Sequence, residues 1–173
     1  MPNRRSQLPP PVVALVAWLV PGAGYWVIGQ PARAVTVGAT IVGLFVLGIF
    51  LAGIRVVEVP GFDEAGRRIN VDHVGRRFDR RDPGYAQGSW VMTSRGLIAE
   101  IANKPWYIPQ IVAGPITLAA SALSVKAAQS GVARVHARLM DIGVLYTAIA
   151  GMLNLLAIID SAHRAGSEAE DRG

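Results

Sequence analysis

The sequence predicts an all-α membrane protein with four transmembrane helices, arranged as two hairpins, and a polar loop of minor β character between helices 2 and 3. Hydrophobic residues make up 51% of the 173 residues and charged residues only 17%, against roughly 25% charged in average soluble domains. Four uncharged stretches approach the length that spans a bilayer, namely residues 12–28, 34–54, 106–125 and 142–159. This composition excludes a disordered protein and disfavours a soluble enzyme.

The four stretches differ in how well they meet the length requirement. A hydrocarbon core of roughly 30 Å needs about 20 helical residues, with about 17 as the lower limit. The second stretch has 21 residues, whereas the first and fourth have 17 and 18. The third contains Pro109 and Pro115, which membrane helices tolerate where neighbours satisfy the freed carbonyls. We therefore expect a transmembrane hairpin at 1–57, a polar loop at 58–105, a second hairpin at 106–160 and a disordered tail at 161–173.

The first stretch has some features of a secretory signal peptide. Arg4 and Arg5 precede it, and the segment 32–34, Ala-Arg-Ala, loosely resembles a cleavage site. That segment lies well past the apolar part, and the stretch itself contains Pro21 and Gly22. These features favour a retained helix, although the sequence leaves open whether the helix is ever cleaved.

The distribution of Lys and Arg predicts an orientation. With four spans, the termini and the long loop share one side of the membrane and carry thirteen basic residues, against four on the other side (Arg33, Lys126, Arg134 and Arg138). Since basic loops stay on the cytoplasmic side, we expect both termini and the long loop in the cytoplasm. A bacterial cytoplasmic membrane is the expected location.

The long loop combines dense charge with weak strand signals. Val57 and Val59, then Ile69 and Val71, alternate with polar residues, a pattern typical of a short β-hairpin. Three Arg pairs invite a nucleic-acid or anionic-lipid interpretation, but seven acidic residues leave the segment 55–105 with a net charge of only +2. We therefore expect a solvated loop that pairs its own charges and binds no nucleic acid. Two alternatives stay open: a protein partner at 58–105, and anionic headgroup contact by Arg76, Arg77, Arg80 and Arg81.

The segment Pro21-Gly22-Ala23-Gly24 interrupts the first stretch. Proline removes a backbone donor, and the two glycines loosen the helix further. The simpler interpretation of Pro21, Gly22 and Gly24 is a kink or helix end that allows close helix approach. The alternative is a broken helix whose exposed backbone lines a substrate or ion site.

The fourth stretch places its small and polar residues on one face. Gly143, Thr147 and Gly151 follow at intervals of four, and Asn154 lies three residues later on nearly the same face. An amide near the bilayer centre is costly in contact with lipid, so Asn154 should point into the bundle and bond to another helix. A structural hydrogen bond is the main interpretation, and a ligand or ion contact is the alternative.

Motifs of catalysis or cofactor binding do not occur in the sequence. There is no cysteine, and none of the three histidines has a partner at metal-ligand spacing. No phosphate-binding loop, nucleotide-binding glycine fingerprint or nucleophile elbow is present. We therefore expect no catalytic residue, no metal and no cofactor.

Two segments resemble known sequences. Residues 17–29, AWLVPGAGYWVIG, followed by a basic residue and an apolar span, are similar to the first hairpin of two-transmembrane-domain proteins. Residues 141–160, DIGVLYTAIAGMLNLLAIID, resemble the last span of an uncharacterised family of bacterial polytopic membrane proteins of unknown function. The resemblance implies a polytopic inner-membrane protein and supplies no activity, cofactor or catalytic residue.

The expected function is non-enzymatic: a membrane scaffold, assembly factor or accessory subunit that presents the long loop to a partner. The alternative is a small transporter or channel component with a broken first helix.

Overall fold

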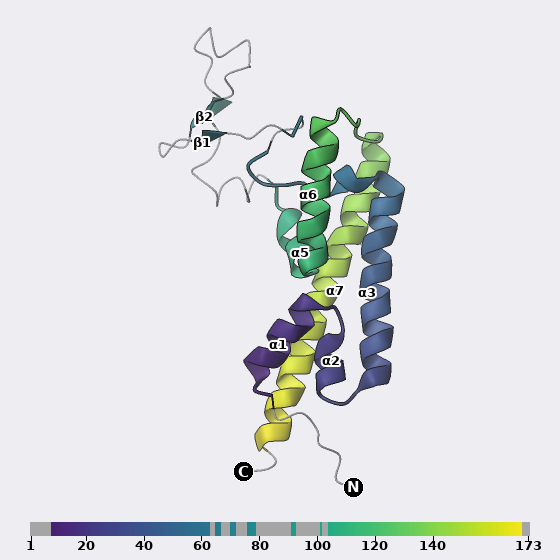
Figure 1. The fold of residues 1–173 in the computed structure, drawn as a ribbon, viewed down its shortest axis with the longest axis vertical. Helices are drawn as coiled ribbons and strands as arrows, with labels where there is room; N and C mark the ends of the chain where they lie inside the picture. Colours follow the sequence, from purple (N-terminus) through teal and green to yellow (C-terminus); the bar gives the residue numbers. More distant parts are fainter. Residues whose placement is uncertain are drawn as a thin grey trace.

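Two long helices form the axis of the fold. The computed structural model describes residues 8–62, 65–66, 70–71, 76–78, 91–92, 101 and 104–170. Helices α3 (Pro31–Ala52) and α7 (Ala137–Glu170) pack side by side along most of α3 (Figure 1). They have 22 and 34 residues, so they are about 33 and 51 Å long at 1.5 Å per residue. Among the described helices, these two are long and apolar enough to cross a membrane.

The first predicted span is not one helix. Helix α1 (Pro10–Leu19) starts with proline, whose fixed φ suits a first turn. It ends because Pro21 disfavours the helical conformation for the residue before it, and Val20 is extended, with φ −134° and ψ 111°. Gly22 then adopts φ +84° and starts the five-residue helix α2 (Ala23–Val27). The chain turns back here, so residues 12–28 do not form one continuous helix.

The third predicted span is interrupted in the same way. Helix α5 (Tyr107–Val112) has six residues and helix α6 (Pro115–Gln129) has fifteen. Between them Gly114 has φ +96°, a conformation that a residue with a Cβ rarely adopts. Pro115 then occupies the first turn of α6. Neither helix reaches the length of about 17 residues that a span requires.

The expectation of four transmembrane helices in two hairpins therefore differs from the structure, which has two long apolar helices and two short helical hairpins. Figure 1 shows that α1 and α2 lie beside the C-terminal half of α7, whereas α5 lies beside its N-terminal half and α6 packs on α5 and η1. The start of α1 and the end of α7 lie at one end of the bundle, and the connection that follows α3 lies at the other.

The described part of the long loop contains only short elements of regular secondary structure. After the 3₁₀ turn η1 (Ile54–Val56) come three strands of two or three residues: β1 (Asn70–Val71), β2 (Arg76–Phe78) and β3 (Val91–Met92). They pair antiparallel in the order β1-β2-β3. The prediction that Val57 and Val59 form a strand is wrong, because both follow η1 outside any strand. The bundle itself is built of helices.

The C-terminal segment also differs from its prediction. Residues 161–170 continue α7 as helix, whereas a disordered tail was expected from 161. A salt bridge from Arg164 to Asp160, four residues earlier on α7, supports this extension.

The bundle is apolar outside and partly polar inside. Large apolar side chains are exposed on long and short helices alike, including Leu15 on α1, Phe50 on α3, Leu123 on α6 and Leu156 on α7. Phe50 is 84% exposed. Polar side chains are meanwhile fully buried, at Gln110, Thr117, Thr147, Asn154 and Ser161. This distribution is the reverse of that in water-soluble domains, where contiguous apolar surface is limited, and it suggests a membrane location.

Candidate functional site

The break between α5 and α6 is held by hydrogen bonds from three different helices. A helix end leaves its last carbonyls without their usual i+4 partners. In α5 the carbonyls of Gln110 and Ile111 accept from the backbone N–H groups of Ala113 and Gly114, and side chains donate to the carbonyls of residues 110–112. The side chain of Thr117 on α6 donates to the first of them. Trp18 on α1 donates its indole N–H to the second at 3.3 Å, and Asn154 on α7 donates to the third at 2.9 Å. Asn154 therefore satisfies the carbonyl of Val112, and Thr117 and Trp18 each add a bond to a carbonyl that also accepts from the backbone.

Gln110 connects the same break to the loop end of the bundle. Its side chain is fully buried, and its amide nitrogen lies 2.8 Å from Thr147 Oγ1 and 3.4 Å from the carbonyl of Val56. Thr147 in turn donates to the carbonyl of Val144 at 2.9 Å. Among the described side chains, the buried oxygens Gln110 Oε1 and Asn154 Oδ1 have no hydrogen-bond partner. Ser121 Oγ on α6 is buried without a partner as well, so these three oxygens are the acceptors left open among the described side chains.

The break between α1 and α2 is closed by backbone contact. A Cβ on Gly22 would collide with the carbonyl oxygen of Ala34 and would lie 2.9 Å from the Cα of Gly38. The carbonyl of Pro21 packs against Gly38 in return. A Cβ on Gly24 would collide with Ser161 on α7. Pro21, Gly22 and Gly24 therefore seat the first hairpin on α3 and α7, and the described contacts there are close packing.

The two breaks meet each other inside the bundle. A Cβ on Gly114 would collide with the carbonyl oxygen of Trp18, so the tip of the second hairpin rests on the end of α1. The indole of Trp18 bonds to the carbonyl of Ile111 beside it. The tips of the two hairpins therefore support one another.

The four α7 residues predicted to share a face all lie at helix contacts. Gly143 packs against Ala52 and Gly48 of α3, and Thr147 packs beside Gly48. One turn further along, Gly151 lies against the carbonyl of Pro109 on α5. Asn154 is completely buried and bonds to α5, as described above. The glycines bring backbones together, and the polar residues bond across the contact.

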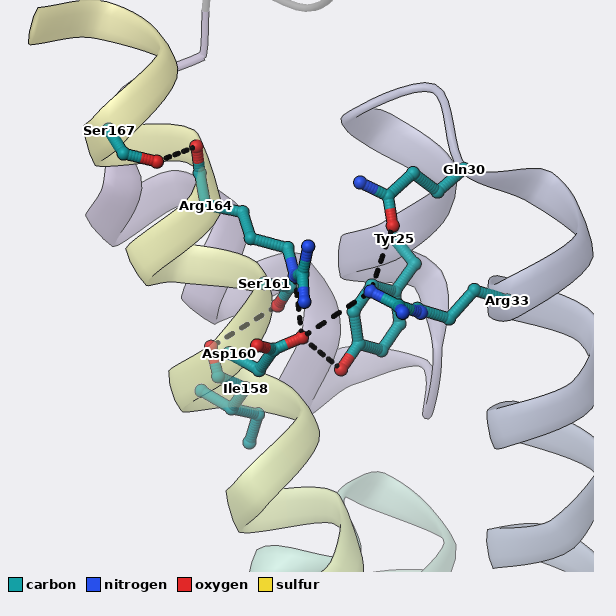
Figure 2. A network of polar contacts seen from close by, with 8 residues as sticks. All are labelled: Tyr25, Gln30, Arg33, Ile158, Asp160, Ser161, Arg164 and Ser167. Atoms are coloured by element: carbon teal, nitrogen blue, oxygen red, sulfur yellow. Dashed lines mark hydrogen bonds and ion pairs between the residues drawn. The ribbon is translucent and has the colours of Figure 1, made fainter.

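A second polar cluster lies near the chain termini (Figure 2). Tyr25 of α2 donates to Asp160 Oδ2 at 2.9 Å, and Arg164 Nε donates to the same oxygen at 2.8 Å. Arg33 at the start of α3 approaches that oxygen at 3.9 Å and lies over the Tyr25 ring, 5.6 Å from its centre. The Asp160 and Arg33 side chains are 43% and 45% exposed. One carboxylate therefore connects the first hairpin, α3 and α7 at this end.

The opposite end of the bundle carries the start of the long loop. Lys104 Nζ donates to the carbonyls of Val59 and Phe62 at 2.7 Å each, and Ser124 of α6 donates to the carbonyl of Val57 at 2.9 Å. A cavity of about 450 Å³ lies at this end. Its lining combines acidic, aromatic and aliphatic side chains, from Glu58, Trp106, Met140, Asp141, Val144 and Leu145.

Sequence reasoning missed Gln110, Trp18 and Thr117. Gln110 is the one amide in the third apolar stretch, and it stands between the two prolines that disturb that helix. An amide beside a helix-breaking pair was the signal that could have indicated a capped break. Among the described residues, no group of three His, Cys, Asp or Glu side chains is placed to hold a metal ion.

In the part of the chain that the structure describes, the fold is a helical bundle with two apolar helices that suggest a membrane location. Two shorter helices are interrupted, one closed by backbone packing and the other held by side-chain hydrogen bonds. The chain belongs to the family DUF6677, a family of unknown function, whose match covers residues 12–172. Neither the curated proteins nor the solved structures contain a significant match to the sequence.

Proposed function

We propose that the protein is an integral membrane protein of the bacterial cytoplasmic membrane. In this proposal it acts without catalysing a reaction, as a scaffold, assembly factor or accessory subunit of a membrane complex. One observation carries the structural role: buried or partly buried polar side chains donate to the backbone carbonyls at the break between α5 and α6. Thr117, Trp18 and Asn154 are all used in this way. Side chains used in this way stabilise the fold, and this use does not require a solute pathway.

The loop end of the bundle is the surface we propose for a protein partner. Its cavity joins the half-exposed ring of Trp106 to the carboxylates of Glu58 and Asp141. Aromatic side chains are enriched at protein interfaces. Glu58 lies 3.6 Å from Arg134, so Asp141 is the carboxylate that suits a basic residue of a partner. The adjoining segment 58–105 adds further contact area. Anionic headgroups are a second proposed partner, at Arg76 and Arg77 in β2; Arg80 and Arg81 lie outside the described residues. No binding of nucleic acid is proposed.

Co-purification with a matched pair of variants tests this proposal. The tagged full chain is extracted in mild detergent from its membrane, and partners are quantified against an untagged control. Trp106→Ala, at the cavity, should lower the recovery of a stoichiometric partner. Trp26→Ala, at the other end, removes an equally large ring that is 60% exposed and should leave recovery unchanged. A monomer with no stoichiometric partner would overturn the proposal.

A transporter or channel component is the second candidate. Gln110 Oε1 and Asn154 Oδ1 are buried acceptors beside two interrupted helices, and interrupted helices form the substrate sites of many transporters. Proteoliposomes containing the wild-type chain should then show a solute flux that Asn154→Leu lowers. Wild-type vesicles that are as tight as empty ones would reject this candidate.

A further inference from the structure

The two short hairpins enter the bundle from opposite ends. At one end, Pro10 of α1 packs near Gly166 of α7, and Tyr25 of α2 bonds to Asp160. The start of α3 reaches the same Asp160 through Arg33. Helix α1 therefore runs inward from this end, and α2 returns to it before α3 begins (Figure 1).

The second hairpin does the same from the loop end. Gln110 of α5 lies near the carbonyl of Val56 in η1, and the end of α5 reaches Asn154, halfway along α7. Helix α6 then returns to the loop end. This direction is shown by Ser124 and Gln129, which bond to the carbonyls of Val57 and Gly66 after the end of α3.

The two halves of the chain therefore repeat one plan in opposite directions. Each half is a hairpin with a positive-φ glycine at its tip, Gly22 or Gly114, followed by one long apolar helix, α3 or α7. Repeats of inverted topology are a common plan of membrane proteins. The tips meet where Gly114 contacts Trp18, and α7 lies beside both hairpins.

We infer that the chain crosses the membrane twice, through α3 and α7, and that its termini lie on the face opposite to the long loop. This inference rests on the membrane location proposed above. Helices of ten, five, six and fifteen residues are each shorter than the length of about 17 residues that a crossing needs. Two crossings place the connection 130–136 on the same face as the loop, whereas four crossings would separate them.

Charge then decides which face is cytoplasmic. Two crossings leave five basic residues on the face of the termini: Arg4, Arg5, Arg33, Arg164 and Arg172. The other twelve of the 17 belong to the face of the loop. Since basic connections stay in the cytoplasm, the loop and its cavity face the cytoplasm, and the termini face outward. A partner at Trp106 is therefore a cytoplasmic protein or a membrane protein with a cytoplasmic part.

Single cysteines test this topology directly, because the chain contains no native cysteine. Intact cells that express the full chain are treated with a membrane-impermeant maleimide, and permeabilised cells show which sites react at all. Ala32→Cys and Ser89→Cys serve as controls, because both topologies place the first outside and the second inside. Val132→Cys and Ser167→Cys discriminate between them.

We expect Ser167→Cys to react in intact cells and Val132→Cys to react only after permeabilisation. The reverse pattern at these two positions would overturn the two-crossing topology. If positions 89 and 132 react in intact cells while 32 and 167 do not, two crossings hold and the orientation is wrong. Release of the wild-type chain from membranes by alkaline carbonate would instead reject the membrane location, so the two failures are distinguishable.

Discussion

The contact between α5 and α7 at Gly151 gives the sharpest test of the packing. A Cβ at this position would collide with the carbonyl oxygen of Pro109, would lie 2.7 Å from its carbonyl carbon and would lie 3.3 Å from the nitrogen of Ala113. All three atoms belong to the backbone of α5 or of the residue that follows it, so none can rotate away. In Gly151→Ala, α5 must therefore move away from α7.

The expected cost follows from three contributions. Forcing an extra methyl into a packed core costs roughly 1–3 kcal/mol. Moving α5 also strains the hydrogen bond from Asn154 to the carbonyl of Val112, and bonds of this kind between membrane helices contribute about 0.6 kcal/mol on average and up to about 1.7. Alanine favours a helix over glycine by up to about 1 kcal/mol. The variant should therefore lose between about 1 and 4 kcal/mol of unfolding free energy.

Gly43→Ala is the matched control. It is the same substitution in the other long helix, but a Cβ at Gly43 would meet nothing within 4 Å. Only the gain in helix propensity remains, so this variant should be as stable as the wild type or up to about 1 kcal/mol more stable. The two substitutions are thus expected to change stability in opposite directions.

Unfolding in mixed micelles measures both variants under one condition. Helix content is followed by circular dichroism while SDS is titrated into a fixed concentration of mild detergent. If Gly151→Ala unfolds at the same SDS fraction as Gly43→Ala, the close approach of α5 to α7 is not present in the folded protein. A Gly151→Ala chain that fails to accumulate in membranes where Gly43→Ala accumulates shows the expected direction in a stronger form.

Three further substitutions test the polar contacts. Asn154→Leu removes the donor to the carbonyl of Val112 and should lower the unfolding free energy by about 1 kcal/mol in the same titration; no loss would show that this carbonyl needs no cap. Tyr25→Phe removes one bond to Asp160, whose side chain is 43% exposed, and should cost less than about 1 kcal/mol; a larger loss would mean that this cluster is shielded from water. Lys104→Met removes the donor to two loop carbonyls, so hydrogen exchange should quicken in that loop segment while global unfolding is unchanged, and equal exchange would reject this role for the lysine.

Hydropathy predicted the long helices well because each is a continuous apolar run, which is a property of the local sequence. The second apolar stretch, 34–54, corresponds to α3 within three residues at each end, and 142–159 lies wholly inside α7. Both are runs without an interior proline. The inward face of α7 was also accessible from sequence, since a spacing of four residues fixes which side chains share a helix face.

The two interrupted stretches could not be separated from spans in this way. Hydropathy sums apolar surface and is insensitive to whether the backbone hydrogen bonds continue. Proline alone does not decide the matter, because membrane helices often bend at proline and continue. What allows the chain to reverse after Val112 is a set of donors from elsewhere in the sequence, among them the indole of Trp18 and the amide of Asn154. The breaks therefore depend on contacts between segments that are distant in the sequence.

The count of basic residues could not reveal the number of crossings either. Four crossings divide the 17 basic residues into thirteen and four, and two crossings divide them into twelve and five. Both divisions place the long loop in the cytoplasm under the same rule. They differ only for the termini, with four basic residues, and the segment 126–138, with three, which exchange sides and nearly balance in basic charge. The two topologies are distinguished by the direction in which each hairpin enters the bundle. The first hairpin contacts Asp160 in the C-terminal part of α7, whereas the second begins near η1, at the opposite end of the bundle.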